Sequence, residues 1–336
     1  MGLKVAINKK SFEKNGKPFF YLADTCWSAF TNINENDWKY YLQYRKRQGY
    51  NVLQINILPQ WDASATDLNH SPYQKDEKGN YQFDKLNDSY FNHARSMCEV
   101  AKEYGFELAL VVLWCNYVPA TWANNMLSHN TMPYEEIDGY IKKVNETFTD
   151  LDPLYVISGD TDLNEEISCS YYLKASQLLH ELAPNCLQSL HVRGRLMEIP
   201  EKLIKQMDFY MFQSGHNAKL ENRAMPYCLP EYFIEHYPVK PLLNSEPCYE
   251  QMGYSSNMYG RFHQFEIRRA AWQSILTGAF AGITYGAAGI YSWHTYGKEF
   301  ANEVGEGFDS PNPWHLAIHY PGAWDYSCLL YTSDAA

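Results

Sequence analysis

Eight short, mostly apolar runs recur along the 336-residue chain, and amphipathic stretches separate them. Runs without polar alternation are typical of parallel strands covered on both faces. The runs span residues 19–24, 51–57, 107–113, 154–158, 187–191, 209–213, 241–244 and 282–285. Eight successive βα units without a linker-like tract predict an α/β fold, a single-domain (β/α)8 TIM barrel.

An open, doubly wound sheet is the alternative fold, and it usually carries a glycine-rich phosphate turn after its first strand. Here that turn reads LADTCWSAF, which has no glycine. The sequence therefore favours the barrel.

Helix signals lie between the predicted strands. Asn34 is a capping residue for a helix that ends near Gly49, and Asp88 precedes one that Gly105 stops. Two later helices are expected from apolar stripes, namely Tyr172, Ala175, Leu179 and Leu182 in one, and Phe265, Trp272, Ile275 and Ala279 in the other.

Composition narrows the classes of partner. The chain has 28 basic and 39 acidic residues, a formal charge of -11, and no basic cluster. This balance argues against electrostatic binding to nucleic acid or to an anionic membrane. An aromatic content of 16%, with 28 Tyr and 9 Trp, favours a carbohydrate partner, because flat rings with polar tips suit the faces of sugars.

The N-terminus lacks the apolar core of a secretion signal, and the longest apolar run, 108–115, is too short to span a bilayer. The eight cysteines form no CxxC motif, and Cys98, Cys115 and Cys169 sit in apolar patterns typical of reduced, buried thiols. We therefore expect a cytoplasmic protein without membrane association.

Active sites of TIM barrels lie at the carboxyl ends of the strands. The fourth and seventh strands end in SGD and NSEP, which place Asp160 and Glu246 at their tips. A glycosidic bond is cleaved between two carboxyl groups, so these two are the predicted catalytic pair. Asp162 competes with Asp160 for its role, and Glu250 is either a supporting partner or a surface acid.

The other strand ends carry polar and aromatic residues suited to sugar binding. We expect this group to bind substrate: Asp24, Trp27, Trp61, Trp114, Asn116, His191, Gln213, His216, Trp293 and His294. Asp24 binds a sugar hydroxyl or orients another side chain. The long polar and aromatic segment 58–86 is expected to cap one side of the site, because long loops in compact domains are usually functional.

Metal and cofactor signals are weak. His191, His216 and His294 are potential metal ligands, but no acidic partner has a diagnostic spacing, and no GxSxG motif indicates a serine hydrolase. We therefore expect no metal and no cofactor.

At FFYLADTCWSAF, RKRQGYNVLQINILPQ, YVISGD and PLLNSEPCYE the chain resembles the apiosidase-like barrels, glycoside hydrolase family 140 and its uncharacterised relatives, over residues 8–324. The resemblance implies hydrolysis of plant cell-wall glycans, in the characterised type at the bond between apiose and galacturonic acid in pectin. It also implies that Asp160 is the acid/base and Glu246 the nucleophile.

Three departures from the family pattern bear on these expectations. SGD replaces the usual GGD, SEP replaces GEP, and the sandwich domain that usually follows the barrel is absent. The first two leave the carboxyl groups in place but put apiose specificity in question. The barrel is expected to span 1–324, and residues 325–336 to be a non-native or truncated tail.

Two other functions fit the same sequence. One is a catalytically inactive barrel that binds carbohydrate, and the other is a metal-dependent lyase or hydrolase. Turnover of an aryl glycoside excludes the first, and loss of activity with a chelator would reveal the second.

Overall fold

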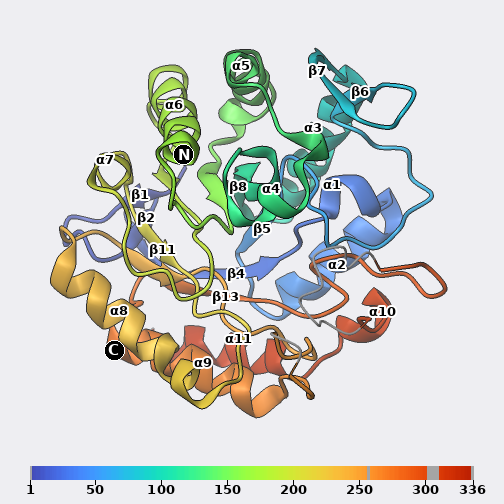
Figure 1. Ribbon diagram of the computed structural model, residues 1–336. Coiled ribbons are helices and arrows are strands. Elements are labelled where there is room, and N and C mark those ends of the chain that lie inside the picture. Colours follow the sequence, from blue (N-terminus) through green and yellow to red (C-terminus); the bar gives the residue numbers. More distant parts are fainter. Residues whose placement is uncertain (1, 256–257, 301–309, 334–336) are drawn as a thin grey trace.

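The computed structural model describes residues 2–255, 258–300 and 310–333. Its main sheet has eight parallel strands in the order β10-β9-β8-β5-β4-β13-β12-β11 (Figure 1). In chain order they are β4 (Tyr21–Thr25), β5 (Val52–Asn56), β8 (Glu107–Trp114), β9 (Leu154–Gly159), β10 (Gln188–Ser189), β11 (Tyr210–Phe212), β12 (Leu242–Asn244) and β13 (Gly282–Tyr285). Each of the eight predicted runs overlaps one of these strands, and β4, β8 and β9 extend one residue further than predicted.

The two end strands of this order, β10 and β11, lie next to each other and nearly close the barrel. The Asp208 N–H donates to the Gln188 carbonyl at 2.8 Å, and the Ser189 hydroxyl donates to the Phe209 carbonyl at 2.8 Å. The prediction of a (β/α)8 barrel is confirmed.

Helices surround the strands (Figure 1). The longer ones are α2 (Glu35–Arg47), α3 (Asp88–Glu103), α5 (Ile137–Phe148), α6 (Glu166–Leu182), α8 (Met225–His236), α9 (Gln264–Thr277) and α11 (Gly322–Ser333). Short turns of helix complete the connections: α1 (Ala29–Asn32), α4 (Trp122–Met126), α7 (Glu201–Ile204), α10 (Trp314–Ala317), η1 (Cys115–Tyr117), η2 (Ser128–Asn130), η3 (Tyr134–Glu136), η4 (Thr149–Leu151) and η5 (Leu220–Ala224).

The predicted helix starts are close to those observed. Asn34 caps α2 and accepts the Asp37 N–H at 3.0 Å, whereas Asn87, one residue before Asp88, caps α3. The stripe predicted for α9 is wrong at Phe265, whereas Trp272 and Ile275 pack half-buried against the core and Ala279, just after the helix, is buried. Phe265 is 68% exposed, and the buried face is instead made of Ile267, Ala270, Ala271 and Ser274. Small residues occupy this face because α9 packs against both α8 and α11.

Two small antiparallel sheets flank the barrel. Strands β1 (Lys4–Val5), β2 (Phe12–Lys14) and β3 (Lys17–Phe19) place the Phe12 ring 5.2 Å from that of Phe209, at the end where the barrel strands begin. Strands β6 (Tyr73–Lys75) and β7 (Tyr81–Leu86) form a hairpin in the long segment after β5.

The C-terminal residues 322–333 continue the fold as helix α11. Tyr326 and Leu329 are buried in the core, and the Ser327 hydroxyl donates to the Gln48 carbonyl beyond α2. The boundary at residue 324 stays a prediction. All eight cysteines are free thiols, and Cys98, Cys115 and Cys169 are buried as expected. Within residues 2–255, 258–300 and 310–333, no helix has the length and apolar character needed to cross a bilayer.

Candidate active site

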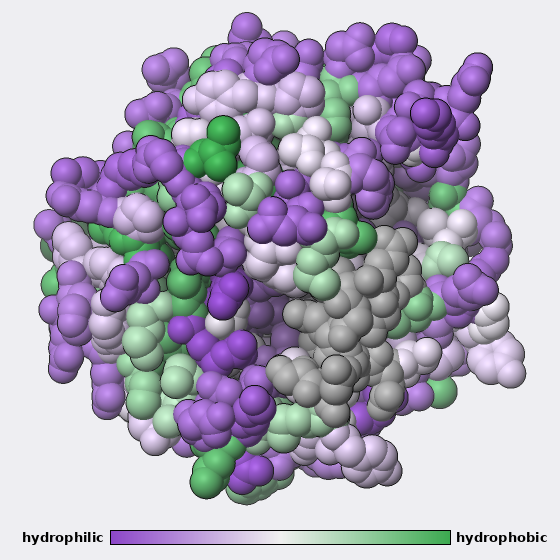
Figure 2. All heavy atoms as spheres, viewed as in Figure 1, coloured by the Kyte–Doolittle hydropathy of each residue, from purple (hydrophilic) through white to green (hydrophobic). Residues whose placement is uncertain are grey.

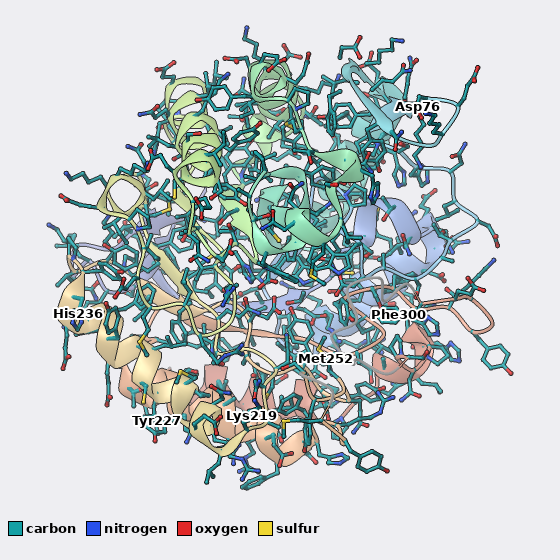
Figure 3. All side chains as sticks on the ribbon, viewed as in Figure 1. Asp76, Lys219, Tyr227, His236, Met252 and Phe300 are labelled. Atoms are coloured by element: carbon teal, nitrogen blue, oxygen red, sulfur yellow. The ribbon has the colours of Figure 1, made fainter. Side chains whose placement is uncertain are left out.

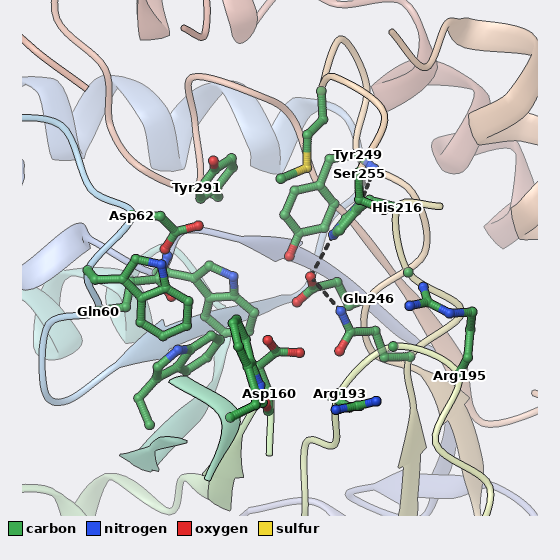
Figure 4. A pocket seen from close by; sticks show the side chains of 18 residues that line it. Gln60, Asp62, Asp160, Arg193, Arg195, His216, Glu246, Tyr249, Ser255 and Tyr291 are labelled. Atoms are coloured by element: carbon green, nitrogen blue, oxygen red, sulfur yellow. Dashed lines mark hydrogen bonds and ion pairs between the residues drawn. The ribbon is translucent and has the colours of Figure 1, made fainter. Parts of the chain in front are cut away.

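A cavity of about 270 Å³ opens at the carboxyl ends of the barrel strands. Figure 2 shows a hydrophilic hollow near the centre of this face, and Figure 3 places Met252, which lines the cavity, nearer the middle than Tyr227 and His236 of α8. Its wall is made of Trp27, Gln60, Trp61, Asp62, Trp114, Trp122, Asp160, Arg193, Gly194, Arg195, Gln213, Gly215, His216, Glu246, Tyr249, Met252, Ser255 and Tyr291. The structure therefore brings Asp160 and Glu246 into one pocket (Figure 4).

Glu246 follows β12, and backbone hydrogen bonds to the neighbouring β11 segment fix its position. The Ser245 N–H donates to the Phe212 carbonyl at 2.9 Å, and the Gly215 N–H donates to the Glu246 carbonyl at 3.1 Å. The residue is only 7% exposed, so its charge depends on protein partners more than on water.

Three side chains surround the Glu246 carboxylate. His216 Nε2 lies 2.7 Å and Gln213 Nε2 lies 2.9 Å from Oε1, while His191 Nε2 lies 3.2 Å from Oε2. Two of these contacts are drawn as dashed lines in Figure 4. Nitrogen atoms thus lie beside both carboxylate oxygens.

Hydrogen bonds at the Nδ1 atoms of the two imidazoles explain why their Nε2 atoms face Glu246. The Asp160 N–H donates to His191 Nδ1 at 3.1 Å, and the Tyr249 N–H donates to His216 Nδ1 at 3.3 Å. Because each Nδ1 accepts a hydrogen bond, each neutral ring carries its proton on Nε2, which faces Glu246.

These donors decide the charge of Glu246. Burial raises the pKa of a carboxyl group, but the contacts from His191 and His216 outweigh it and lower the pKa of Glu246 to about 2. Glu246 is therefore a carboxylate at neutral pH, although it is buried.

Asp160 follows β9 with a left-handed backbone, φ 48°, which is uncommon for residues other than glycine. Its N–H donates to His191, and its carbonyl accepts the Trp122 indole N–H at 2.6 Å. These bonds hold the strained turn that directs the Asp160 carboxyl group into the pocket (Figure 4).

The glycine before Asp160 has a steric role. A Cβ atom on Gly159 would lie 1.9 Å from Cε3 of Trp114, so a larger residue would displace this ring. Gly286 has the same relation to Tyr249, whose Cδ1 would lie 2.2 Å from a Cβ atom there. Both glycines make room for rings of the pocket wall.

Four tryptophans form one side of the pocket. Ring centroids lie 5.2 Å apart for Trp27 and Trp114, 6.4 Å for Trp61 and Trp114, and 5.3 Å for Trp61 and Trp122. Trp114 Nε1 and Gln213 Oε1 are buried and have no hydrogen-bond partner within the described part of the chain. Apolar rings beside unpaired polar atoms suit a hydroxylated ligand such as a sugar.

Arg193 and Arg195 lie on the other side of the carboxyl pair from Asp62 (Figure 4). Neither arginine was predicted as a binding residue, and neither were Trp122 and Tyr249. A signal was available for two of them, because Arg193 follows the fifth strand closely and Tyr249 stands three residues after Glu246. Trp122 comes from the short helix α4, which no strand-end rule locates.

Seven of the twelve predicted site residues line the pocket: Trp27, Trp61, Trp114, Asp160, Gln213, His216 and Glu246. His191 is fully buried behind Glu246 and contacts the carboxylate. Of the three later tryptophans expected to bind substrate, Trp61, Trp114 and Trp293, the first two line the pocket. Segment 58–86 contributes Gln60, Trp61 and Asp62, so its beginning forms one side of the pocket as expected.

Asp24 and Trp293 do not line the pocket, which corrects the prediction that they bind substrate. The alternative prediction for Asp24, that it orients another side chain, agrees with its contact with Arg45. Asp24 is buried against α2, where its Oδ2 lies 2.6 Å from Arg45 Nε. Strand residues alternate in direction, and this one points to the helix layer. Trp293 stacks on Trp314 at 4.5 Å between ring centroids and also contacts Tyr41.

Asn116 and His294 are also outside the pocket lining. Asn116 lies in the η1 turn, and its carbonyl accepts a hydrogen bond from Asn124 at 2.8 Å. His294 is 2.5 Å from the Ser64 hydroxyl, and this contact holds it against the segment after β5. Each of the two is used in fixing loops.

The remaining acidic candidates also have defined places. Asp162 lies outside this pocket, beside an adjoining groove. Glu250 accepts hydrogen bonds from the Tyr285 hydroxyl at 2.6 Å and the Gly322 N–H at 3.1 Å, so it is a buried structural acid. No group of three or more His, Cys, Asp or Glu residues arranged to hold a metal occurs among the residues described.

Barrels with carboxyl groups in a ring-lined pocket at the strand ends form a large class of glycoside hydrolases, and this chain is of that class. The sequence matches the family model "Apiosidase-like, catalytic domain" over residues 7–333. The chain belongs to the apiosidase-like family, as its sequence motifs predicted. No curated protein matches the sequence.

Solved structures show the same fold. A protein described as a glycoside hydrolase superposes with a TM-score of 0.79 at 24% identity, covering 98% of this chain and 74% of that one. A family 5 glycoside hydrolase from Bacteroides vulgatus ATCC 8482 gives 0.77 at 23% identity, with coverages of 98% and 71%. A family 5 mannosidase from Rhizomucor miehei gives 0.64 at 13% identity, with coverages of 100% and 99%. At these identities the likeness establishes the barrel fold.

Proposed function

We propose that this chain hydrolyses glycosidic bonds in plant cell-wall oligosaccharides by a two-carboxylate mechanism. The observation that carries the proposal is the environment of Glu246. A buried carboxylate kept ionised by two imidazoles and an amide, in a pocket shared with a second carboxyl group, is suited to attack an anomeric carbon.

In the first step, a Glu246 oxygen bonds to the anomeric carbon while the glycosidic bond breaks, and Asp160 gives its proton to the leaving oxygen. In the second step, Asp160 takes a proton from water, and the water oxygen displaces Glu246 from the anomeric carbon. Glu246 returns as a carboxylate and Asp160 as an acid. The product therefore retains the anomeric configuration.

The pocket supports a pectic substrate. The tryptophan wall offers ring faces to one sugar, and a volume of about 270 Å³ lies just below the range of about 300–1,000 Å³ typical of drug-sized ligands. Arg193 and Arg195 on the other side suit a carboxylate, which guanidinium groups bind in a bidentate manner. A neutral sugar joined to a uronic acid, as in the pectic linkage that apiosidases cleave, would contact the tryptophan wall with the first sugar and the arginines with the second.

The test is a screen of pectic oligosaccharides for released sugars, followed by proton NMR of the first-formed anomer. We expect a neutral sugar to be released with its configuration retained. Neutral glucans or mannans hydrolysed faster than uronate-containing substrates would contradict the pectic assignment. An inverted first product would make Glu246 a general base.

A further inference from the structure

An open groove of about 670 Å³ adjoins the pocket, and neither the catalytic mechanism nor the tryptophan wall uses it. Residues 162–164, after β9, form one side, and residues 193–200, after β10, form the other. Arg193, Gly194 and Arg195 line both the pocket and the groove, so the two spaces meet at these residues.

Asp162 is the unusual residue of this groove. It is 6% exposed, and its Oδ2 accepts a hydrogen bond from Asn164 at 3.1 Å, with Arg193 Nη1 at 3.9 Å. Its Oδ1 is buried and has no hydrogen-bond partner within residues 2–255, 258–300 and 310–333. A buried acceptor without a partner costs about 1–3 kcal/mol, so Asp162 is a carboxylate whose hydrogen-bonding capacity the fold leaves incompletely used at the edge of the groove.

The backbone of both walls is strained. Leu163 has φ 56° and Arg195 has φ 70°, values that residues other than glycine rarely adopt. Such strain persists where the surrounding structure holds it, and it is concentrated at ligand-binding segments. Together with Asp160, three left-handed residues therefore lie along the path from the pocket into the groove.

From these observations we propose that the groove is a second sugar subsite, in which the Asp162 carboxylate accepts a hydrogen bond from a hydroxyl group of the leaving-group sugar chain. The inference rests on the proposed glycosidase function. Asp160, the proposed proton donor to the leaving oxygen, stands two residues before Asp162 on the same strand end. A leaving group protonated by Asp160 is therefore next to the groove, while the tryptophan wall holds the released sugar.

A negatively charged acceptor repels a carboxylate, so the sugar that reaches Asp162 presents a hydroxyl there. The uronate carboxyl group stays beside Arg193 and Arg195 at the junction. The enzyme is thereby a hydrolase of oligosaccharides, with specificity set by at least one sugar beyond the bond cleaved.

The test compares two substrates with the same released sugar. One is an aryl glycoside, whose small leaving group ends before the groove, and the other is a pectic oligosaccharide whose leaving group continues for several sugars. In Asp162→Ala we expect kcat/KM to fall about 10- to 100-fold for the oligosaccharide, as for loss of a hydrogen bond to a charged group, and less than about twofold for the aryl glycoside. Asp162→Asn, which keeps the shape of the side chain, should lose less kcat/KM than Asp162→Ala. Its loss should again be larger for the oligosaccharide than for the aryl glycoside.

Asp84→Asn, an exposed carboxylate of β7, is the matched control and should change neither substrate. Equal losses on both substrates in Asp162→Ala would overturn the proposal, because they would place Asp162 in the chemical step. Unchanged kinetics on both, with an unchanged melting temperature, would overturn it too.

A wild-type enzyme inert towards both substrates would instead defeat the proposed function. The groove is then tested by calorimetric binding of the same pectic oligosaccharide. Binding that is lost in Asp162→Ala and kept in Asp84→Asn supports the subsite, and equal binding by all three proteins contradicts it.

Discussion

Replacing His216 with alanine removes a donor that lies 2.7 Å from Oε1 of Glu246. A hydrogen bond to a charged group contributes about 1.5–3 kcal/mol, and one pKa unit corresponds to about 1.4 kcal/mol. The variant should therefore raise the pKa of Glu246 by about one to two units from its value of about 2. Gln213 and His191 remain in contact with the carboxylate and keep the shift from being larger.

The sign follows from the direction of the pKa shift. Because the pKa of Glu246 is lowered from 4.5 to about 2 in the fold, its ionisation stabilises the folded state fully above about pH 4.5, and this contribution is lost as the pH falls towards 2. At pH 3 about nine-tenths of the wild-type enzyme should carry an ionised Glu246. In His216→Ala the fraction should be about half or less.

The assay is kcat/KM against pH with an activated aryl glycoside, for which protonation of the leaving group matters little. We expect the acid limb of the variant to move up by about one to two pH units. His294→Ala is the control, because this buried histidine lies at the same end of the barrel but contacts Ser64. This variant should leave the acid limb of the pH profile in place. Near-UV circular dichroism at each pH confirms that the proteins stay folded. An acid limb that stays in place in His216→Ala, or moves equally in His294→Ala, would refute the assigned electrostatics.

Three further predictions concern other parts of the structure. Asp160→Asn should lose far more activity on substrates with poor leaving groups than on activated aryl glycosides, and equal losses in kcat/KM would move the acid role elsewhere. Gly159→Ala should destabilise the fold by about 1–3 kcal/mol and raise KM, because its Cβ atom would displace the Trp114 ring; an unchanged melting temperature and KM would contradict this steric role. Asp24→Asn should cost about 3–5 kcal/mol in urea unfolding because it leaves the buried Arg45 charge unpaired. Glu35→Gln, at the exposed pair with Lys39, should leave the free energy of unfolding nearly unchanged, and equal effects of the two substitutions would contradict the role of the buried pair.

The barrel was predictable because each of its strands is covered on both faces and therefore appears as a continuous apolar run. The catalytic candidates were predictable for a related reason. Asp160 and Glu246 stand in the turns just after their strands, at the end of the barrel where active sites lie, so both could be located from their position. The support that the two histidines give to Glu246 depends on which nitrogen accepts a backbone N–H, and no spacing in the sequence encodes that.

The two errors have different causes. A residue near a strand end points either to the pocket or to the helices, and one position along the strand exchanges the two directions. Asp24 was assigned to the wrong face because its partner, Arg45, lies on a separate helix. Trp293 was misplaced because a turn with φ 46° directs it to the stack with Trp314, and a non-glycine residue in that conformation gives no signal in the sequence.

The central claim is that the Glu246 carboxylate attacks the anomeric carbon, and turnover by Glu246→Gln tests it most directly. The amide keeps the shape of the side chain but cannot form the covalent intermediate. We predict that kcat on a pectic substrate falls by several orders of magnitude while the melting temperature and substrate binding stay close to those of the wild type. A folded variant that keeps more than about a tenth of the wild-type rate would contradict this role of Glu246, because its activation barrier would have risen by less than about 1.4 kcal/mol.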